Sequence, residues 1–179
     1  IESGTSESGE RYRFNDMAVD DQERLYAVRT LLDSYGLTVK SEQLVRYGAD
    51  GTFEAVLFEQ DYTDAQEKRY RVGGLKNLQM RGDAIYFYND EDGRVSGYRI
   101  GPSDTGPVRT TSFQLPAGKY LADIDGSESG GIYYSTRSGE IYRMERDGSS
   151  TLVYPLPGLD RTRRNFPESL SLDGKGRLL

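Results

Sequence analysis

The sequence predicts an all-β protein built from repeated units of four short antiparallel strands. Its 179 residues include 21 Gly and 14 Tyr, a balance typical of many strands joined by tight turns. Short apolar alternations are separated by turn signals such as Asp-Gly and Gly-Gly. Groups of four such strands recur every ~40–50 residues. The chain is long enough for one domain with a sizeable core.

The expected strands follow from these alternations. The first unit has strands at Arg11–Val19, Leu25–Val28, Val39–Tyr47 and Phe53–Phe58. The second unit has strands at Leu78–Met80, Ala84–Tyr88, Val95–Ile100 and Val108–Leu115. The third unit has strands at Tyr120–Ile124, Ile132–Tyr134, Ile141–Met144 and Thr151–Leu156, and a fourth unit begins at Ser169.

Four-stranded antiparallel units with this period indicate the blades of a β-propeller. We expect a flexible linker over residues 1–10, which are polar and rich in Gly and Ser. The propeller domain covers residues 11–179, with blades at about 11–60, 76–116, 117–157 and 166–179, the last one partial. The charged stretch Gln60–Lys76 is an insertion that lengthens the first repeat.

A repeated phrase supports this register. In the stretches Phe14–Val28 and Phe166–Leu178, Asp20 aligns with Asp173 and Arg24 aligns with Arg177. Tyrosines also recur on the second strand of each unit, where we expect them to pack between blades: Tyr26, Tyr86 and Tyr133.

Two stretches resemble known propeller families. Ile132–Gly148, with Tyr-Tyr-Ser-Thr in its second strand, resembles the YWTD repeat, although this chain has no Trp. Phe166–Leu178 is similar to the phrase of NHL repeats and of the SMP-30/gluconolactonase group. The resemblance implies a ring of about six blades. This chain would then supply three blades and the start of a fourth, as a fragment of a longer protein. No residue here can be matched to the calcium ligands of the lactonase group.

Composition narrows the chemistry. The chain has no His and no Cys, so Ser-His-Asp triads, Cys-His pairs and the usual zinc sites are excluded. A net charge of −6 argues against nucleic acid as a partner. No run of about 18 apolar residues occurs, so this segment is not expected to be embedded in a membrane. These absences favour a binding module over an enzyme.

Candidate binding residues are arginines. Three recur on the third strand of each unit, where they could form a ring of cations that binds an acidic ligand, or pair with carboxylates of a neighbouring blade: Arg46, Arg99 and Arg143. Three more form a basic cluster before the fourth unit, which is either a binding loop or a solvated charged loop: Arg161, Arg163 and Arg164.

A candidate metal site lies at Asp123–Ser129, where oxygen side chains alternate along the chain. Asp123 and Asp125 could bind Ca²⁺, but the spacing departs from that of an EF-hand loop. The alternative is a turn in which Asp and Ser bond their own backbone. No other cofactor is expected.

Two functions remain open. The first is a non-catalytic propeller that binds a small molecule or a protein, as the extracytoplasmic sensor module of a larger bacterial surface or membrane protein; a cytoplasmic location is the alternative. The second is a metal-dependent, lactonase-like propeller hydrolase. In both cases we expect the remainder of the polypeptide, or a second copy, to cover the open edge at residues 169–179.

Overall fold

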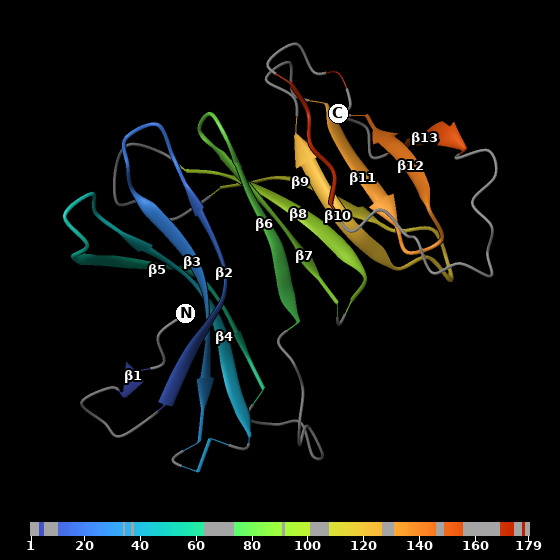
Figure 1. Cartoon of the computed structure of the whole chain (residues 1–179). Helices are drawn as coiled ribbons and strands as arrows, with labels where there is room; N and C mark the ends of the chain where they lie inside the picture. Colours follow the sequence, from blue (N-terminus) through green and yellow to red (C-terminus); the bar gives the residue numbers. More distant parts are fainter. Residues whose placement is uncertain are drawn as a thin grey trace.

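The structure is a computed structural model that describes residues 4–5, 11–33, 35–36, 38–62, 74–90, 92–100, 108–126, 131–145, 149–155, 169–173 and 177. Within these ranges every regular element is a β-strand (Figure 1). None of the described residues belongs to a helix long and apolar enough to cross a membrane.

The strands form three antiparallel sheets (Figure 1). The first sheet contains β1 (Gly4–Thr5), β2 (Arg11–Val19), β3 (Leu25–Leu32), β4 (Val39–Tyr47) and β5 (Phe53–Asp61). The second contains β6 (Leu75–Arg81), β7 (Ala84–Asn89), β8 (Arg94–Arg99) and β9 (Val108–Gln114). The third contains β10 (Leu121–Gly126), β11 (Ile132–Thr136), β12 (Glu140–Met144) and β13 (Ser150–Pro155).

Each sheet is a meander in which strands adjacent in the chain pair with one another. The second sheet stands between the other two (Figure 1). The first strands of the three units are neighbours, because β6 contacts both β2 and β10. This is the arrangement of propeller blades around an axis, so the predicted all-β fold of four-stranded blades is confirmed.

Two residues of the stretch predicted to be a linker take part in the first sheet. Gly4 and Thr5 pair with Tyr12 and Arg11 of β2. The rest of residues 1–10 lies outside the described residues, as do the core of the insertion (63–73) and the chain end at Leu178 and Leu179.

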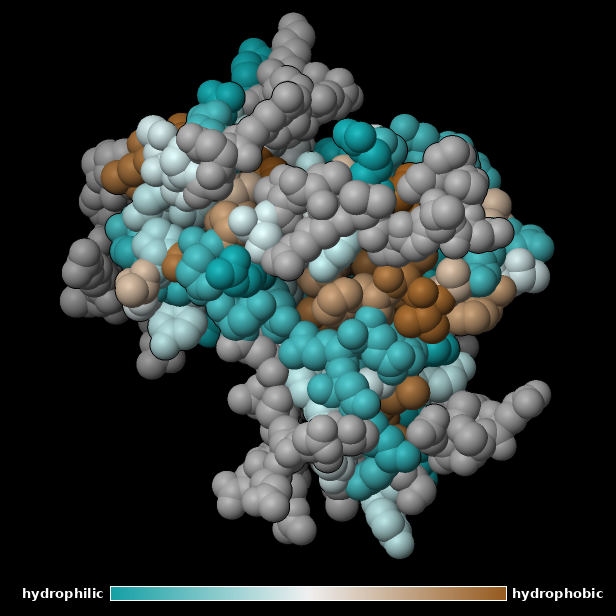
Figure 2. Space-filling model, turned by 180° about the vertical axis from the view of Figure 1, so that it is seen from behind, coloured by the Kyte–Doolittle hydropathy of each residue, from teal (hydrophilic) through white to brown (hydrophobic). Residues whose placement is uncertain are grey.

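The core consists of two apolar layers, one between each pair of neighbouring sheets. The first layer joins Tyr26, Val28 and Leu44 of the first sheet to residues of the second sheet that include Ile85 and Phe87. The second layer joins residues of β7, β8 and β9 to the third sheet, and its members include Tyr88, Val95, Phe113, Ile124, Tyr134 and Met144. Seen from behind, apolar residues gather in a patch at the middle of the molecule, with hydrophilic residues around it (Figure 2).

The predicted tyrosine positions are correct in part. Tyr26 is fully buried in the first layer, and Tyr86 packs against the second. In β11, however, the buried residue is Tyr134, whose ring lies 5.5 Å from Phe113 and stacks on Tyr142 at 5.1 Å. Tyr133 is only half-buried. Successive strand residues face opposite sides of a sheet, so choosing the neighbouring tyrosine reverses the predicted face.

A buried carboxylate ties the first blade to the second. Glu42 of β4 is fully buried, and its Oε2 accepts hydrogen bonds from the Tyr62 hydroxyl at 2.6 Å, Gly74 N at 2.7 Å and Leu75 N at 3.2 Å. Tyr62 follows β5, and Gly74 precedes β6. Glu42 therefore fixes the point where the chain leaves one blade and the point where it enters the next.

We expect Tyr134→Ala to lower the free energy of unfolding by about 3–5 kcal/mol, because it removes a large side chain from the layer between two blades. Tyr133→Ala is the matched control and should cost less than about 1 kcal/mol. Urea unfolding of both variants measures the difference. Equal losses would contradict the assignment of faces in β11.

We expect Glu42→Ala to cost about 3 kcal/mol or more, because two buried N–H groups and a hydroxyl lose their acceptor. Glu59→Ala, an exposed carboxylate of the neighbouring strand, should cost less than about 1 kcal/mol. The same unfolding measurement applies. A loss for Glu42→Ala no larger than that for Glu59→Ala would show that Glu42 does not join the blades.

Candidate functional site

A polar cleft lies where the first strands of the three blades meet. Its volume is about 400 Å³. Side chains from β2, β6 and β10 line it: Asp16, Met17, Ala18, Val19, Asn77, Leu78, Gln79, Met80, Arg81 and Asp123. We take this central cleft as the candidate functional site, because it combines a cavity with carboxylates, amides and a guanidinium.

Three oxygen-bearing side chains reach the cleft from irregular points of their strands. The pairing register shifts between Phe14 and Asp16 in β2, between Lys76 and Gln79 in β6, and between Leu121 and Asp123 in β10. Asn77 has a positive φ of 55°, which is uncommon for a residue other than glycine. Such bulges re-aim a side chain out of the regular alternation. They bring Asp16, Asn77 and Asp123 to the cleft.

The two carboxylates of the central cleft are held by main-chain N–H groups of the next blade. Asp16 Oδ2 accepts from Leu78 N at 2.8 Å, and Asp123 Oδ2 accepts from Leu170 N at 2.7 Å. Asn77 lies between them and donates its Nδ2 to Asp123 Oδ1 at 3.0 Å. These bonds fix the orientation of all three side chains and join neighbouring blades at the axis.

The two residues of the predicted metal site have different places. Asp123 lines the central cleft, whereas Asp125 does not. The Asp125 carboxylate is only 3% exposed; it pairs with Arg81, and its Oδ2 accepts from Leu172 N at 2.8 Å. Residues 127–130 of this stretch lie outside the described part of the chain. Among the described residues, no group of three or more acidic side chains is arranged to hold a metal ion.

The three arginines predicted to form a ring each pair with a carboxylate of their own blade. Arg46 Nε lies 2.6 Å from Glu54 Oε2. Arg99 Nε lies 3.1 Å from Asp83 Oδ2, and Arg143 Nε lies 3.3 Å from Glu145 Oε1. None of the three lines the central cleft.

The register also separates Arg99 from the other two arginines. Arg46 pairs across the ladder with Tyr26, and Arg143 pairs with Tyr133, but the residue opposite Tyr86 is Gly97. Arg99 therefore lies two residues away from the equivalent position. The basic cluster Arg161, Arg163 and Arg164 lies outside the described residues.

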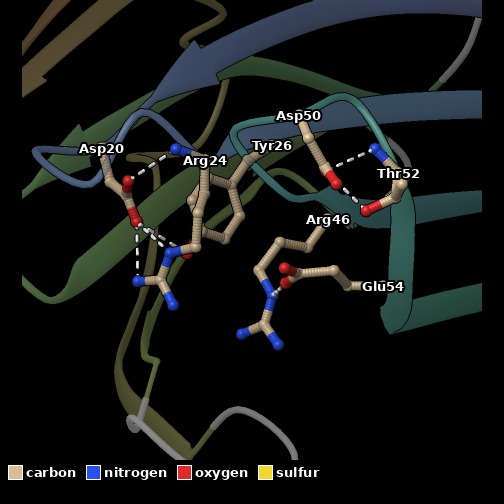
Figure 3. Close-up of polar contacts among 7 residues, drawn as sticks. All are labelled: Asp20, Arg24, Tyr26, Arg46, Asp50, Thr52 and Glu54. Atoms are coloured by element: carbon tan, nitrogen blue, oxygen red, sulfur yellow. Dashed lines mark hydrogen bonds and ion pairs between the residues drawn. The ribbon is translucent and has the colours of Figure 1, made fainter.

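The repeated Asp–Arg phrase forms the same clasp in both copies. Asp20 Oδ1 accepts from Arg24 N at 2.9 Å, and Asp20 Oδ2 accepts from Arg24 Nε at 2.7 Å (Figure 3). Asp173 makes the same two bonds with Arg177 at 2.9 and 2.7 Å. In the first copy the Tyr26 hydroxyl also donates to Asp20, at 3.1 Å. Figure 3 shows Arg46 and Glu54 beside this clasp.

The clasp shifts the pKa of Asp20. Burial by itself would raise the pKa of this carboxyl, but hydrogen bonds from the Arg24 side chain, the main chain of Arg24 and Gln22, and Tyr26 outweigh it. The net result is a pKa below the usual value. The charged form of Asp20 is therefore the one that stabilises the folded protein.

The fold is shared with solved propeller proteins. The structure is similar to a gluconolactonase from Xanthomonas campestris, with a TM-score of 0.59, 14% identity, and coverage of 97% of this chain and 55% of that one. It is also similar to a calcium-binding protein, regucalcin, from Agrobacterium tumefaciens, with a TM-score of 0.55, 15% identity, and coverage of 84% and 47%. A luciferin-regenerating enzyme gives a TM-score of 0.55 at 14% identity, with coverage of 91% and 50%.

These similarities show the propeller fold, which the chain shares with a gluconolactonase and with regucalcin. The likenesses to NHL and YWTD repeats stay predictions. The chain spans about half the length of these solved structures. No known protein family and no curated protein matches the sequence.

We expect Asp20→Asn to lower the free energy of unfolding at pH 7 by about 1–2 kcal/mol, because a charged acceptor of several hydrogen bonds becomes neutral. The folded-state pKa of Asp20 lies below its unfolded value, so its contribution is complete above the unfolded pKa of about 3.9. As the pH falls through the folded-state pKa, this contribution is lost.

The difference in unfolding free energy between wild type and Asp20→Asn should thus stay constant from about pH 7 to pH 5 and shrink below about pH 4. Urea unfolding across this pH range measures it. Asp21→Asn, an exposed residue of the same turn, is the control and should change stability little. An Asp20→Asn difference that does not change with pH would contradict the role of the clasp.

Proposed function

We propose that the chain belongs to a lactonase-like propeller hydrolase that binds a small polar lactone in its central cleft with the help of a divalent cation. One observation carries this proposal: β2, β6 and β10 direct two carboxylates and a carboxamide into one cleft at the axis of the blades. A neighbour in fold is a gluconolactonase, and another is a calcium-binding protein. The missing histidine is compatible with this chemistry, since a cation-assisted hydrolysis does not need it.

The cleft offers the types of ligand atom that a hard cation prefers. Asp16, Asn77 and Asp123 offer carboxylate and amide oxygens, the ligands that Ca²⁺ and Mg²⁺ prefer. Each is oriented by a hydrogen bond from or to a neighbouring blade, as the ligands of metal sites commonly are. Ca²⁺ takes six to eight oxygens, so these three groups would supply part of its shell. When bound, such a cation polarises a carbonyl and activates water.

A second candidate is a propeller that binds a small molecule without catalysis. It is favoured by the hydrogen bonds that the carboxylate oxygens of the cleft already accept, and by the lack of a three-acid group among the described residues. Under this hypothesis Asp16 and Asp123 hold the blades together and contact the ligand, but no cation. A sensor role and an extracytoplasmic location stay predictions.

The proposal predicts that calcium stabilises the protein and supports lactone hydrolysis. After dialysis against a chelator, added Ca²⁺ should raise the melting temperature in a saturable manner. Hydrolysis of glucono-1,5-lactone, followed by acid release above the spontaneous rate, should depend on the same titration. A protein that binds the lactone or a polyol, with neither response to calcium, would support the non-catalytic alternative and overturn the proposal.

Asp16→Asn and Asp123→Asn should each lower calcium affinity or kcat/KM by about 10–100-fold. Asn keeps one acceptor oxygen, so the bonds to Leu78 N and Leu170 N can persist in part. Asp50→Asn is the control, because Asp50 bonds Thr52 in the turn between β4 and β5 and does not line the cleft. Unchanged calcium affinity and activity in both cleft variants would exclude these carboxylates as ligands.

A further inference from the structure

We propose that Arg81 makes the central cleft selective for ligands with an anionic substituent, a carboxylate or a phosphate. Arg81 is the cationic residue among those that line the cleft. It ends β6, four residues after Asn77, so it lies further along the same strand. One end of the cleft thus carries the oxygens of Asp16, Asn77 and Asp123, and the other carries a guanidinium.

The guanidinium is held in place from β10. Its Nε donates to the Gly126 carbonyl, and its Nη2 donates to the Asp125 carboxylate. Nη1 donates to the Met80 carbonyl at 3.3 Å. Asp125 is itself fixed, because its carboxylate also accepts from Gly126 N and Leu172 N, both at 2.8 Å. Arg81 is therefore pre-organised rather than free to rotate.

Two of the five Arg81 N–H groups have no acceptor among the described residues. A guanidinium carries five N–H groups, and three of those of Arg81 have acceptors among the described residues. The Arg81 side chain is 36% exposed, whereas the Asp125 side chain is 3% exposed. Of the two groups, the guanidinium is therefore the one that a ligand can reach. A planar guanidinium whose two other N–H groups have no acceptor within the described ranges suits a carboxylate or phosphate oxygen better than a hydroxyl.

The neighbouring strand leaves space for this side chain. Gly126 has no Cβ, and a Cβ at that position would lie 2.9 Å from Arg81 Cγ. Any other residue at position 126 would require the stem of Arg81 or its neighbour to shift. Arg81 is therefore partly exposed at its guanidinium but fitted closely against a glycine of β10 and a buried acid.

The inference rests on the proposed function only in placing the substrate in the central cleft. If the substrate is a lactone, the inference specifies its class: a sugar lactone that carries an acidic group apart from the ring. The Arg81 guanidinium would then hold the acidic group while the ring lies toward Asp16 and Asp123. This role is one of binding and specificity, so Arg81 would affect KM more than kcat.

The test compares ligands of matched shape by calorimetry, with and without calcium. Gluconate and sorbitol differ by a carboxylate, and glucose 6-phosphate and glucose differ by a phosphate. We expect the wild-type protein to bind at least one anion about tenfold more tightly than its neutral partner. The pair that shows the preference tells which anion the site takes. Equal affinities in both pairs would overturn the inference.

Two variants test whether the preference for anions depends on Arg81. Arg81→Met should bring the two affinities within about threefold of each other, and Gly126→Ala should do the same while leaving both charges in place. Arg99→Met is the control: Arg99 also pairs with a carboxylate but does not line the cleft. A folded Arg81→Met or Gly126→Ala protein that keeps the full anion preference would refute the proposal, even if its melting temperature fell.

The two proposals fail separately. Absence of lactone hydrolysis with an Arg81-dependent anion preference would reject the hydrolase and keep this inference. The opposite result is calcium-dependent hydrolysis of a neutral lactone that is unchanged in Arg81→Met, without any anion preference in the wild type. It would keep the hydrolase and reject the role of Arg81.

Discussion

The structure depends on hydrogen bonds that cross from one blade to the next at the axis. β6 and β10 are edge strands of their sheets, and β2 pairs with the short β1 only at Arg11 and Tyr12, so each has a stretch with no strand beside it in its own sheet. Main-chain N–H groups on that edge still need acceptors. Carboxylates of the preceding blade supply them: Asp16 accepts from Leu78, Asp123 from Leu170, and Asp125 from Leu172. Side chains thus replace the strand ladder between blades.

This arrangement links stability and function, because the same carboxylates that join the blades also line the central cleft. A ligand that draws on Asp16 or Asp123 changes groups that set the spacing of β2, β6 and the segment at Leu170. Glu42 joins the first two blades away from the cleft, whereas the apolar layer between these blades shares Leu78 and Met80 with the cleft lining. Substitutions in the cleft are therefore expected to change stability as well as ligand binding.

The sequence predicts the repeated elements well and the individual side chains less well. Turn signals and apolar alternation locate the strands and the four-stranded units, and the Asp–Arg phrase predicts the equivalence of Asp20 and Asp173, because both depend on residues close in the chain. Tyr133 is taken for Tyr134 because period-2 alternation does not say which face meets a neighbour. Arg99 is misaligned with Arg46 for a similar reason. Of the polar residues at the cleft, Asp123 is predicted from the sequence as a candidate ligand but Asp16 and Asn77 are not, because bulges break the alternation at all three.

A local pattern could nevertheless have pointed to the cleft. A short polar residue stands directly before an apolar one at the bulge of each first strand: Asp16-Met17, Asn77-Leu78 and Asp123-Ile124. Ser169-Leu170 follows the same pattern, four residues before Asp173 as Asp16 is before Asp20. The chemistry of the polar residue sets the direction of the bond. The two aspartates accept from the next blade, whereas Asn77 faces an acceptor and donates. An amide at position 77 therefore avoids a third carboxylate beside Asp123, where like charges would repel.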